Sequence, residues 1–377
     1  MTRLYKVRIL AALLAASLSG AAMAQLPTSF LRGGDVSEIP EVEAKGGHYS
    51  FHGKQMDPFA IMHQAGWNFV RFRIWNEPKG GWCDKEHTLA MAKRAAVEGL
   101  KISLDFHYSD WWADPGKQFK PKAWKYLPFD KLKRAVYDYT KDVVSAMVAQ
   151  GTPPYMVQVG NEITGGTLWP DGKVTGNDPA VWKPLVTLLS AGFDAVHDAA
   201  GSNSIITMIH LDRGGDNKGA TWWFDNAIKN GLKFDTIGLS YYPVWHGNIA
   251  AMQANVNDLA TRYGKDVYIV ETGYPWVIDT RSRSSEHVEG DDKGLLADFP
   301  ATPDGQARFL AKVLDVIQAI PGGHGKGLLY WAPTWISPGK SASPYDNLAL
   351  FNYDGDALPS LEVLGGLGSG KGTAVNK

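Results

Sequence analysis

The sequence predicts a single-domain α/β fold of the (β/α)8 TIM-barrel class. Short, β-rich apolar runs recur eight times along the chain, segments with helical periodicity separate them, and helix-capping residues mark many boundaries. Strands that alternate with helices favour parallel βαβ units, and eight such units are the number that closes a barrel. A doubly wound open sheet is the alternative. The sequence contains no visible internal repeat, so a solenoid is not indicated.

The predicted strands cover, in chain order, residues 30–36, 67–75, 100–108, 155–160, 204–211, 234–241, 266–271 and 326–332. The predicted helices cover residues 57–65, 88–98, 130–149, 181–200, 248–263 and 302–320, with a weaker one over 222–230. Two long connections, 109–129 and 272–301, follow predicted strands. We expect them to shape the functional site, because loops after barrel strands lie on the catalytic face.

Residues at the helix boundaries have specific capping roles. A capping side chain followed by proline starts a helix at Asp57, Asp178 and Thr302. Glycines are expected just beyond the C-terminal ends of helices at Gly99, Gly151, Gly201 and Gly231.

The first residues have the features of a secretory signal peptide. Basic residues precede an apolar run over 9–18, and Ala22-Met23-Ala24 offers a small-x-small cleavage site. The apolar run is too short to span a bilayer. We therefore expect export to the periplasm or the medium. The predicted organisation is a signal peptide over 1–24, a barrel over 25–364 and a flexible Gly-rich tail over 365–377.

The composition describes a globular protein and excludes several classes of partner. The 377 residues include 38 Lys+Arg against 39 Asp+Glu, a net charge of −1. Proteins that bind nucleic acids or anionic membranes usually carry a basic excess, so neither partner is expected. The single cysteine, Cys83, cannot form an internal disulfide. We expect a monomer stabilised by its core.

Polar side chains stand at the ends of almost every predicted strand, where barrel enzymes place catalytic residues. Glu162 and Glu271 end the fourth and seventh strands, which lie roughly across the mouth of a closed barrel. Two facing carboxyl groups suit glycoside cleavage, because one protonates the leaving oxygen while the other attacks the anomeric carbon. Two glutamates in unrelated salt bridges are the alternative that position alone leaves open.

Stretches beside these strand ends are similar to those of a known family. The stretch 105–116 is long and specific, whereas the Asn161-Glu162 pair is shared with cellulases, mannanases and xylanases. On these stretches the chain resembles glycoside hydrolase family 53, the arabinogalactan endo-β-1,4-galactanases, from about residue 31 to residue 351. The similar stretches are 33–37, 71–78, 105–116, 157–163, 240–243, 270–274 and 330–331.

The resemblance implies a retaining barrel glycosidase that cleaves β-1,4-galactan by double displacement. Glu162 would be the general acid/base, and Glu271 would be the nucleophile. Asn161 would hold the 2-hydroxyl of the sugar being cleaved. Tyr241 or Tyr242 would donate a hydrogen bond to the nucleophile.

Further residues would order this site. Arg73 would supply the positive charge that keeps Glu271 ionised, and His107 would line the same site. Asp35 and Asp110 are candidates to bind sugar hydroxyls.

Aromatic side chains at the strand ends suit a sugar chain, because a ring stacks on the apolar face of a pyranose. The chain contains 14 Trp, as many as Phe. Trp331 is best placed as the platform under the central sugar, and core packing is the alternative for each of the others. The remaining candidates are Trp75, Trp111, Trp245 and Trp276, together with Trp112, Trp169 and Trp335.

The motifs require no metal and no cofactor. Some bacterial members of the family resemble calcium binders in the loop after the seventh strand, so a structural calcium is the alternative. The acids of this loop do not follow a spacing that maps onto a calcium site. They are Asp279, Glu286, Glu289, Asp291 and Asp292.

Two other functions stay open from the sequence. One is a related retaining enzyme that cleaves another β-1,4-glycan, such as mannan, xylan or glucan. The other is a non-catalytic glycan-binding barrel, which would normally lack one catalytic carboxylate. Because both Glu162 and Glu271 are present, the second of these is disfavoured.

Overall fold

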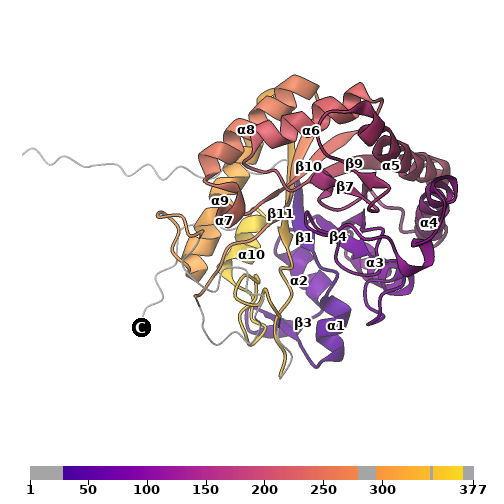
Figure 1. The fold of residues 1–377 in the computed structure, drawn as a ribbon. Helices are drawn as coiled ribbons and strands as arrows, with labels where there is room; N and C mark the ends of the chain where they lie inside the picture. Colours follow the sequence, from indigo (N-terminus) through magenta and orange to yellow (C-terminus); the bar gives the residue numbers. More distant parts are fainter. Residues whose placement is uncertain (1–28, 279–293, 340–342, 368–377) are drawn as a thin grey trace, which may run out of the picture.

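The computed structural model describes residues 29–278, 294–339 and 343–367. Within them, parallel strands close into a barrel with helices around it (Figure 1). The order around the barrel is β1-β12-β11-β10-β9-β6-β5-β4, and β4 pairs again with β1. The predicted (β/α)8 fold is confirmed, and the open sheet is excluded. The predicted signal peptide over 1–24 lies outside the described residues.

Each predicted strand is present in the barrel, with boundaries that differ by a few residues at most. Their bounds are β1 (Leu31–Asp35), β4 (Phe69–Ile74), β5 (Lys101–Phe106), β6 (Met156–Val159), β9 (Ile206–Leu211), β10 (Thr236–Tyr241), β11 (Asp266–Thr272) and β12 (Gly325–Trp331).

The predicted helices are also present, and the predicted caps explain where three of them begin. Asp57, Asp178 and Thr302 each accept a hydrogen bond from a backbone N–H in the first turn. These helices are α2 (Pro58–Gln64), α3 (Lys85–Val97), α4 (Phe129–Ala149), α5 (Pro179–Ala200), α6 (Asn217–Lys229), α8 (Ile249–Tyr263) and α9 (Pro303–Gln318).

Several short elements were not predicted, because tertiary contacts rather than local periodicity hold them. Trp67, for example, donates its indole N–H to the carbonyl of Leu361 in α10. The additional helices are α1 (Ile39–Ala44), α7 (Pro243–His246), α10 (Pro359–Leu364) and the single 3₁₀ turns η1 (Lys122–Trp124), η2 (Ile163–Gly165) and η3 (Pro321–Gly323). Two small hairpins pair β2 (Tyr49–Phe51) with β3 (Lys54–Met56), and β7 (Gly166–Thr167) with β8 (Gly172–Lys173).

Apolar packing fills the lower part of the barrel and leaves its mouth to polar groups. The interior cluster consists of Leu31, Phe69, Met156, Met208, Tyr268, Val270 and Leu329. A larger cluster fills the space between the strands and the surrounding helices. The barrel is so tight that a Cβ on Gly33 would lie 1.7 Å from the carbonyl oxygen of Phe69. This packed base fixes the strand ends that carry the site.

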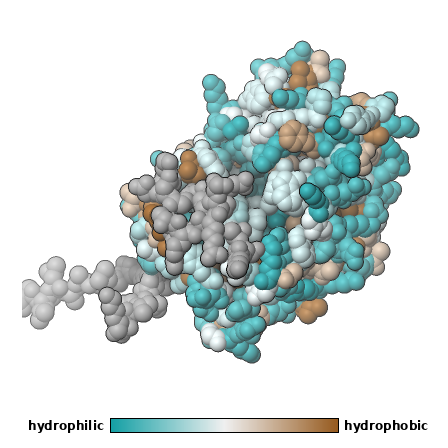
Figure 2. Space-filling view, turned by 60° about the horizontal axis from the view of Figure 1, so that its bottom comes forward, coloured by the Kyte–Doolittle hydropathy of each residue, from teal (hydrophilic) through white to brown (hydrophobic). Residues whose placement is uncertain are grey.

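The face shown in Figure 2 is mostly hydrophilic, with hydrophobic residues scattered between polar ones. In the part of the chain that the structure describes, no helix combines the length and apolarity needed to cross a membrane.

Candidate active site

A cavity of about 1510 Å³ opens at the carboxyl ends of the barrel strands. Its walls combine carboxyl groups with indole and phenol rings, a mixture that suits the hydroxyls and apolar faces of sugars. The side chains lining it include Arg73, Trp75, Asp110, Trp111, Trp112, Asn161, Glu162, Asp212, Tyr242, Trp245, Glu271, Trp331, Trp335 and Tyr345.

Glu162 and Glu271 meet in this cavity. Together with His210, each offers an atom within 4.8 Å of the others. Glu162 follows β6 and takes a left-handed backbone conformation with φ of 48°, which turns the chain sharply out of the strand. Glu271 lies within β11 and is 4% exposed.

A register shift between β10 and β11 directs Glu271 toward its neighbours. Leu239 pairs with Ile269, but the next residue, Ser240, pairs with Glu271 and not with Val270. Val270 belongs to the apolar interior of the barrel. Because β-bulges re-aim side chains, the extra residue lets both Val270 and Glu271 face the interior. Ser240 Oγ accordingly lies 3.4 Å from Glu271 Oε2.

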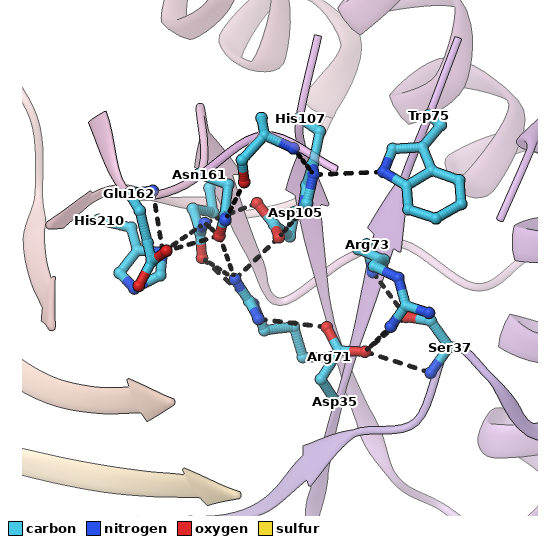
Figure 3. A network of polar contacts seen from close by, with 12 residues as sticks. Asp35, Ser37, Arg71, Arg73, Trp75, Asp105, His107, Asn161, Glu162 and His210 are labelled. Carbon is cyan, nitrogen blue, oxygen red and sulfur yellow. Dashed lines mark hydrogen bonds and ion pairs between the residues drawn. The ribbon is translucent and has the colours of Figure 1, made fainter. Parts of the chain in front are cut away.

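Arg71 is the cation that contacts Glu271. Its Nη1 donates to Glu271 Oε1 at 2.9 Å, and its Nη2 donates to Asp105 Oδ2 at 2.8 Å and to Asn161 Oδ1 at 3.0 Å. The guanidinium also reaches Asp35 Oδ2 at 3.2 Å (Figure 3). A planar guanidinium suits this role, because it presents several fixed donors to different carboxylates.

Arg73 was predicted to supply this charge, and that prediction is wrong. Arg73 Nη1 lies 3.2 Å from Asp35 and 3.6 Å from Glu38. Its guanidinium sits 4.4 Å from the ring centroid of Trp112. Both arginines face the barrel interior, but Arg73 stands one layer nearer the mouth, so it meets the aromatic wall and not Glu271.

The two carboxyl groups differ in their affinity for a proton. Burial, the negative charge of Glu271 and that of Asp212 hold the pKa of Glu162 well above its usual range. Burial also raises the pKa of Glu271, to about 7, while the adjacent Arg71 opposes the rise. Glu271 is therefore the first of the pair to ionise, and Glu162 keeps its proton.

The tyrosine alternative is resolved by geometry. Tyr242 Oη donates to Glu271 Oε2 at 3.4 Å. Tyr241 Oη points away from the cavity and donates to the carbonyl of Gly247 at 3.0 Å. Tyr242 is therefore the side chain placed to act on Glu271.

His107 and Asp35 lie behind the cavity and do not line it as predicted. His107 Nδ1 accepts from the indole N–H of Trp75 at 3.2 Å, and its Nε2 lies 3.0 Å from Asp105. Asp35 is fully buried and binds both Arg71 and Arg73. Their geometry orients the residues that face the cavity.

Most of the predicted aromatic residues form the cavity wall. Trp331, which is 6% exposed, lies in its floor beside Tyr242. Trp111 and Trp245 are 54% and 59% exposed, so their rings are available at the entrance. Trp112 and Trp335 stack with ring centroids 5.9 Å apart. These four rings also belong to the lining.

Trp276 does not line the cavity, contrary to the prediction. Its indole N–H donates to the carbonyl of Asp346, and its ring packs on Tyr353. Trp169 is likewise absent from the lining, since its indole N–H donates to the carbonyl of Gly165 at 2.8 Å and Lys173 lies over its ring. The strand-end position that suggested both residues does not specify which way a side chain points.

Asp110 lines the cavity, but its carboxylate already has structural partners. It accepts hydrogen bonds from the backbone N–H groups of Glu77 at 3.0 Å and of Lys122 at 2.7 Å. These bonds tie the loop after β5 to the loop after β4. Asp110 therefore shapes the entrance beside Trp111.

Residues 31–364 of the chain match the family model described as Glycosyl hydrolase family 53. The chain belongs to glycosyl hydrolase family 53. The prediction of a glycoside hydrolase and the resemblance on which it rested are thereby confirmed.

Individual relatives match over nearly their full length. The chain is 42% identical over 346 residues to an uncharacterized Niallia circulans protein, covering 89% of this chain and 93% of that one. It is 36% identical to an arabinogalactan endo-beta-1,4-galactanase from Cellvibrio japonicus, and the match covers 94% of this chain and 96% of that one. A solved structure, the Ignisphaera aggregans GH53 catalytic domain, aligns with a TM-score of 0.83 at 36% identity, covering 91% and 97%.

Among the residues that the structure describes, one group in the site has the ligand types of a metal centre, namely Glu162, His210 and Glu271. Protein donors and acceptors already engage these atoms: Ser240 contacts all three side chains, and Arg71 binds Glu271. Hydrogen bonding accounts for the cluster, so we assign no metal to it. The acids considered for calcium, from Asp279 to Asp292, lie outside the described residues.

Sequence reasoning missed the polar layer beneath the two glutamates. Gln158 Oε1 accepts from Arg71 Nη2 at 3.0 Å, and His210 lies 2.8 Å from Ser240. Ser240 Oγ lies within hydrogen-bond distance of Glu162 Oε1, at 2.6 Å. Their positions at strand ends were visible, but their mutual contacts depend on side-chain depth and on the β10–β11 bulge.

Proposed function

We propose that the chain is an endo-β-1,4-galactanase that hydrolyses pectic galactan with retention of anomeric configuration. Family membership supports glycoside hydrolysis, and the galactanase named among the relatives supports the substrate. The observation that carries the mechanism is the pair Glu162 and Glu271, whose facing atoms lie within 4.8 Å. Retaining glycosidases hold their carboxyl groups about 5–5.5 Å apart, whereas inverting enzymes need about 6.5–9.5 Å.

The two steps follow from the charge states of the pair. In the first, a carboxylate oxygen of Glu271 bonds to the anomeric carbon, the bond to the leaving oxygen breaks, and Glu162 gives its proton to that oxygen. In the second, water attacks the same carbon, Glu162 takes a proton from the water, and the bond to Glu271 breaks. Asn161 borders the same cavity and is held by Arg71, so it is positioned for the 2-hydroxyl.

The size and lining of the cavity support a polymeric substrate. Its volume of about 1510 Å³ exceeds the roughly 300–1,000 Å³ of a site for a single small ligand. Trp111 and Trp245 at the entrance offer rings to sugars beyond the one being cleaved. A neutral polysaccharide needs no electrostatic attraction, which fits the net charge of −1.

The test is reducing-sugar release from β-1,4-galactan, mannan, xylan and carboxymethylcellulose, measured side by side. We expect galactan to be the preferred substrate, and equal or greater activity on mannan or xylan would contradict the assignment. Glu162→Ala and Glu271→Ala are each expected to abolish hydrolysis while retaining galactan binding. Wild-type rates in either variant would exclude the proposed roles.

Export belongs to the same proposal. The basic start, the apolar run over 9–18 and the site at Ala22-Met23-Ala24 support removal of residues 1–24. Expression of the full chain in a bacterium, followed by N-terminal sequencing of the protein outside the cytoplasm, is expected to begin at Gln25. Retention of Met1 in an entirely cytoplasmic product would contradict export.

A further inference from the structure

The hydroxyl of Ser240 lies between the two carboxyl groups. Its Oγ is 2.6 Å from Glu162 Oε1 and 3.4 Å from Glu271 Oε2, and His210 Nε2 lies 2.8 Å away on another side. Ser240 is fully buried. A hydroxyl has one hydrogen to donate and lone pairs with which to accept, so its orientation has to follow the state of these neighbours.

The state of His210 follows from its other nitrogen. His210 Nδ1 lies 3.0 Å from Asn161 Oδ1. That atom is the oxygen of the amide, because Asn161 Nδ2 donates to the carbonyl of Ala113 and Arg71 Nη2 donates to Oδ1. An oxygen can only accept here, so the hydrogen-bond network assigns the hydrogen of His210 to Nδ1.

Two other donors approach the same nitrogen of His210 and do not compete with this assignment. The N–H of Glu162 is 3.4 Å away, longer than the contact to Asn161. The Nε2 of Gln158 has Asp105 Oδ1 at 2.5 Å and a backbone carbonyl as acceptors for its two hydrogens. Burial and the charge of Arg71 hold the pKa of His210 well below its usual range, so the ring is neutral. Its Nε2 therefore accepts a hydrogen from Ser240.

These contacts form a directed chain when Glu162 carries its proton. The carboxylic O–H of Glu162 donates to Ser240 Oγ over the 2.6 Å contact, and the Ser240 O–H donates to His210 Nε2. Each donor meets an acceptor, so these contacts hold the Oε1 side of the Glu162 carboxyl group in one orientation, and the residue itself lines the cavity.

We propose that Ser240 is the positioning residue that serves Glu162 in both of its protonation states. Once Glu162 has given its proton to the leaving oxygen, it can only accept, and the Ser240 hydroxyl turns from His210 to donate to it. Glu271 is then bonded to the sugar and no longer competes as a charged acceptor. The proposal rests on the double-displacement function given above.

The charged and titratable groups that face Glu162 come from several elements. Glu271 on β11, Asp212 after β9 and Asp114 in the loop after β5 disfavour a negative charge on Glu162, whereas the hydrogen bond from Ser240 favours it. Arg71 contributes its charge through Glu271, and His210 is neutral. When Glu162 has to act as a base, Glu271 is bonded to the sugar, and the hydrogen bond from Ser240 offsets the remaining charges of Asp212 and Asp114.

The test separates the two chemical steps with 2,4-dinitrophenyl β-1,4-galactobioside. Its leaving group departs without protonation, so kcat/KM reports attack by Glu271, while kcat reports the step in which Glu162 acts as a base. For Ser240→Ala we expect kcat to fall about tenfold or more, because a hydrogen bond to a charged group is lost. The acidic limb of kcat should move upward by about one pH unit. We expect kcat/KM to fall less than about threefold.

Tyr242→Phe is the matched control. It removes the other hydroxyl that reaches Glu271 Oε2 at 3.4 Å, and no hydrogen bond joins Tyr242 to Glu162. We expect it to lower kcat/KM without moving the acidic limb of kcat.

A pre-steady-state burst of dinitrophenol should be present for Ser240→Ala, because the second step limits turnover in this variant.

Two outcomes are distinguishable. If Ser240→Ala lowers kcat and kcat/KM equally, or leaves the acidic limb in place, the role of Ser240 is refuted while the galactanase assignment stands. If the wild-type enzyme releases neither dinitrophenol nor sugars from galactan, the proposed function itself fails.

Discussion

Replacing Arg71 with lysine tests the charge network most severely. The guanidinium serves five side-chain acceptors: Asp35, Asp105, Gln158, Asn161 and Glu271. A lysine ammonium has three hydrogens, so at least two of these buried acceptors lose their hydrogen bond to residue 71. Each lost bond costs about 1–3 kcal/mol, or about 2–6 kcal/mol together. Expressed entirely at the transition state, that loss is a roughly 30-fold to 10⁴-fold fall in kcat/KM.

The assay is kcat/KM on galactan across pH, combined with thermal unfolding to separate activity from stability. Arg71 opposes the rise of the Glu271 pKa to about 7. Weakening the contact should therefore move the acidic limb of kcat/KM upward, because Glu271 has to be ionised to attack. Arg73→Lys is the control, since Arg73 binds Asp35 and Glu38 and not the two central glutamates. A change of less than threefold in Arg71→Lys, with an unmoved limb, would refute the reasoning.

Two further predictions concern stability and substrate binding. Burial raises the pKa of Glu38 to about 7. The folded state therefore holds a proton on Glu38 that the unfolded chain releases near pH 4.5. The contribution of this proton to the free energy of unfolding is complete below about pH 4.5 and is lost as the pH rises through 7. The melting temperature of Glu38→Gln should accordingly depend less on pH between 5 and 8 than that of the wild type, and an unchanged slope would contradict the burial argument. Trp111→Ala should raise KM for galactan several-fold without a change in melting temperature, because its ring is 54% exposed at the entrance. Trp276→Ala should lower the melting temperature and leave KM unchanged, since the Trp276 ring packs on Tyr353 outside the cavity. A raised KM in that variant would show that Trp276 belongs to the binding site.

The barrel could be predicted from the sequence because its signals are local. Buried parallel strands appear in the sequence as continuous apolar runs. N-cap residues such as Asp57 and Thr302 mark the start of the following helix. The short α10 carries no comparable signal, because its place depends on contacts such as that between Trp67 and Leu361. Local physics therefore specifies the repeated units, and tertiary contacts specify the small additions.

The site was predictable in composition but not in connectivity. Glu162 and Glu271 stand at strand ends, and the topology brings strand ends together. Arg71 and Arg73 have the same orientation in β4, since they are two residues apart. Only their different depths decide which one reaches Glu271. The contact between Ser240 and Glu271 depends on the bulge between β10 and β11, which no residue pattern predicts.

The measurement that bears most directly on the central claim is the anomeric configuration of the first product. In the mechanism proposed above, Glu271 attacks the sugar directly and forms a covalent intermediate, which fits facing carboxyl atoms within 4.8 Å. Proton NMR during galactan hydrolysis should show the β-anomer of the new reducing end before mutarotation. An α-anomer formed first would contradict the account.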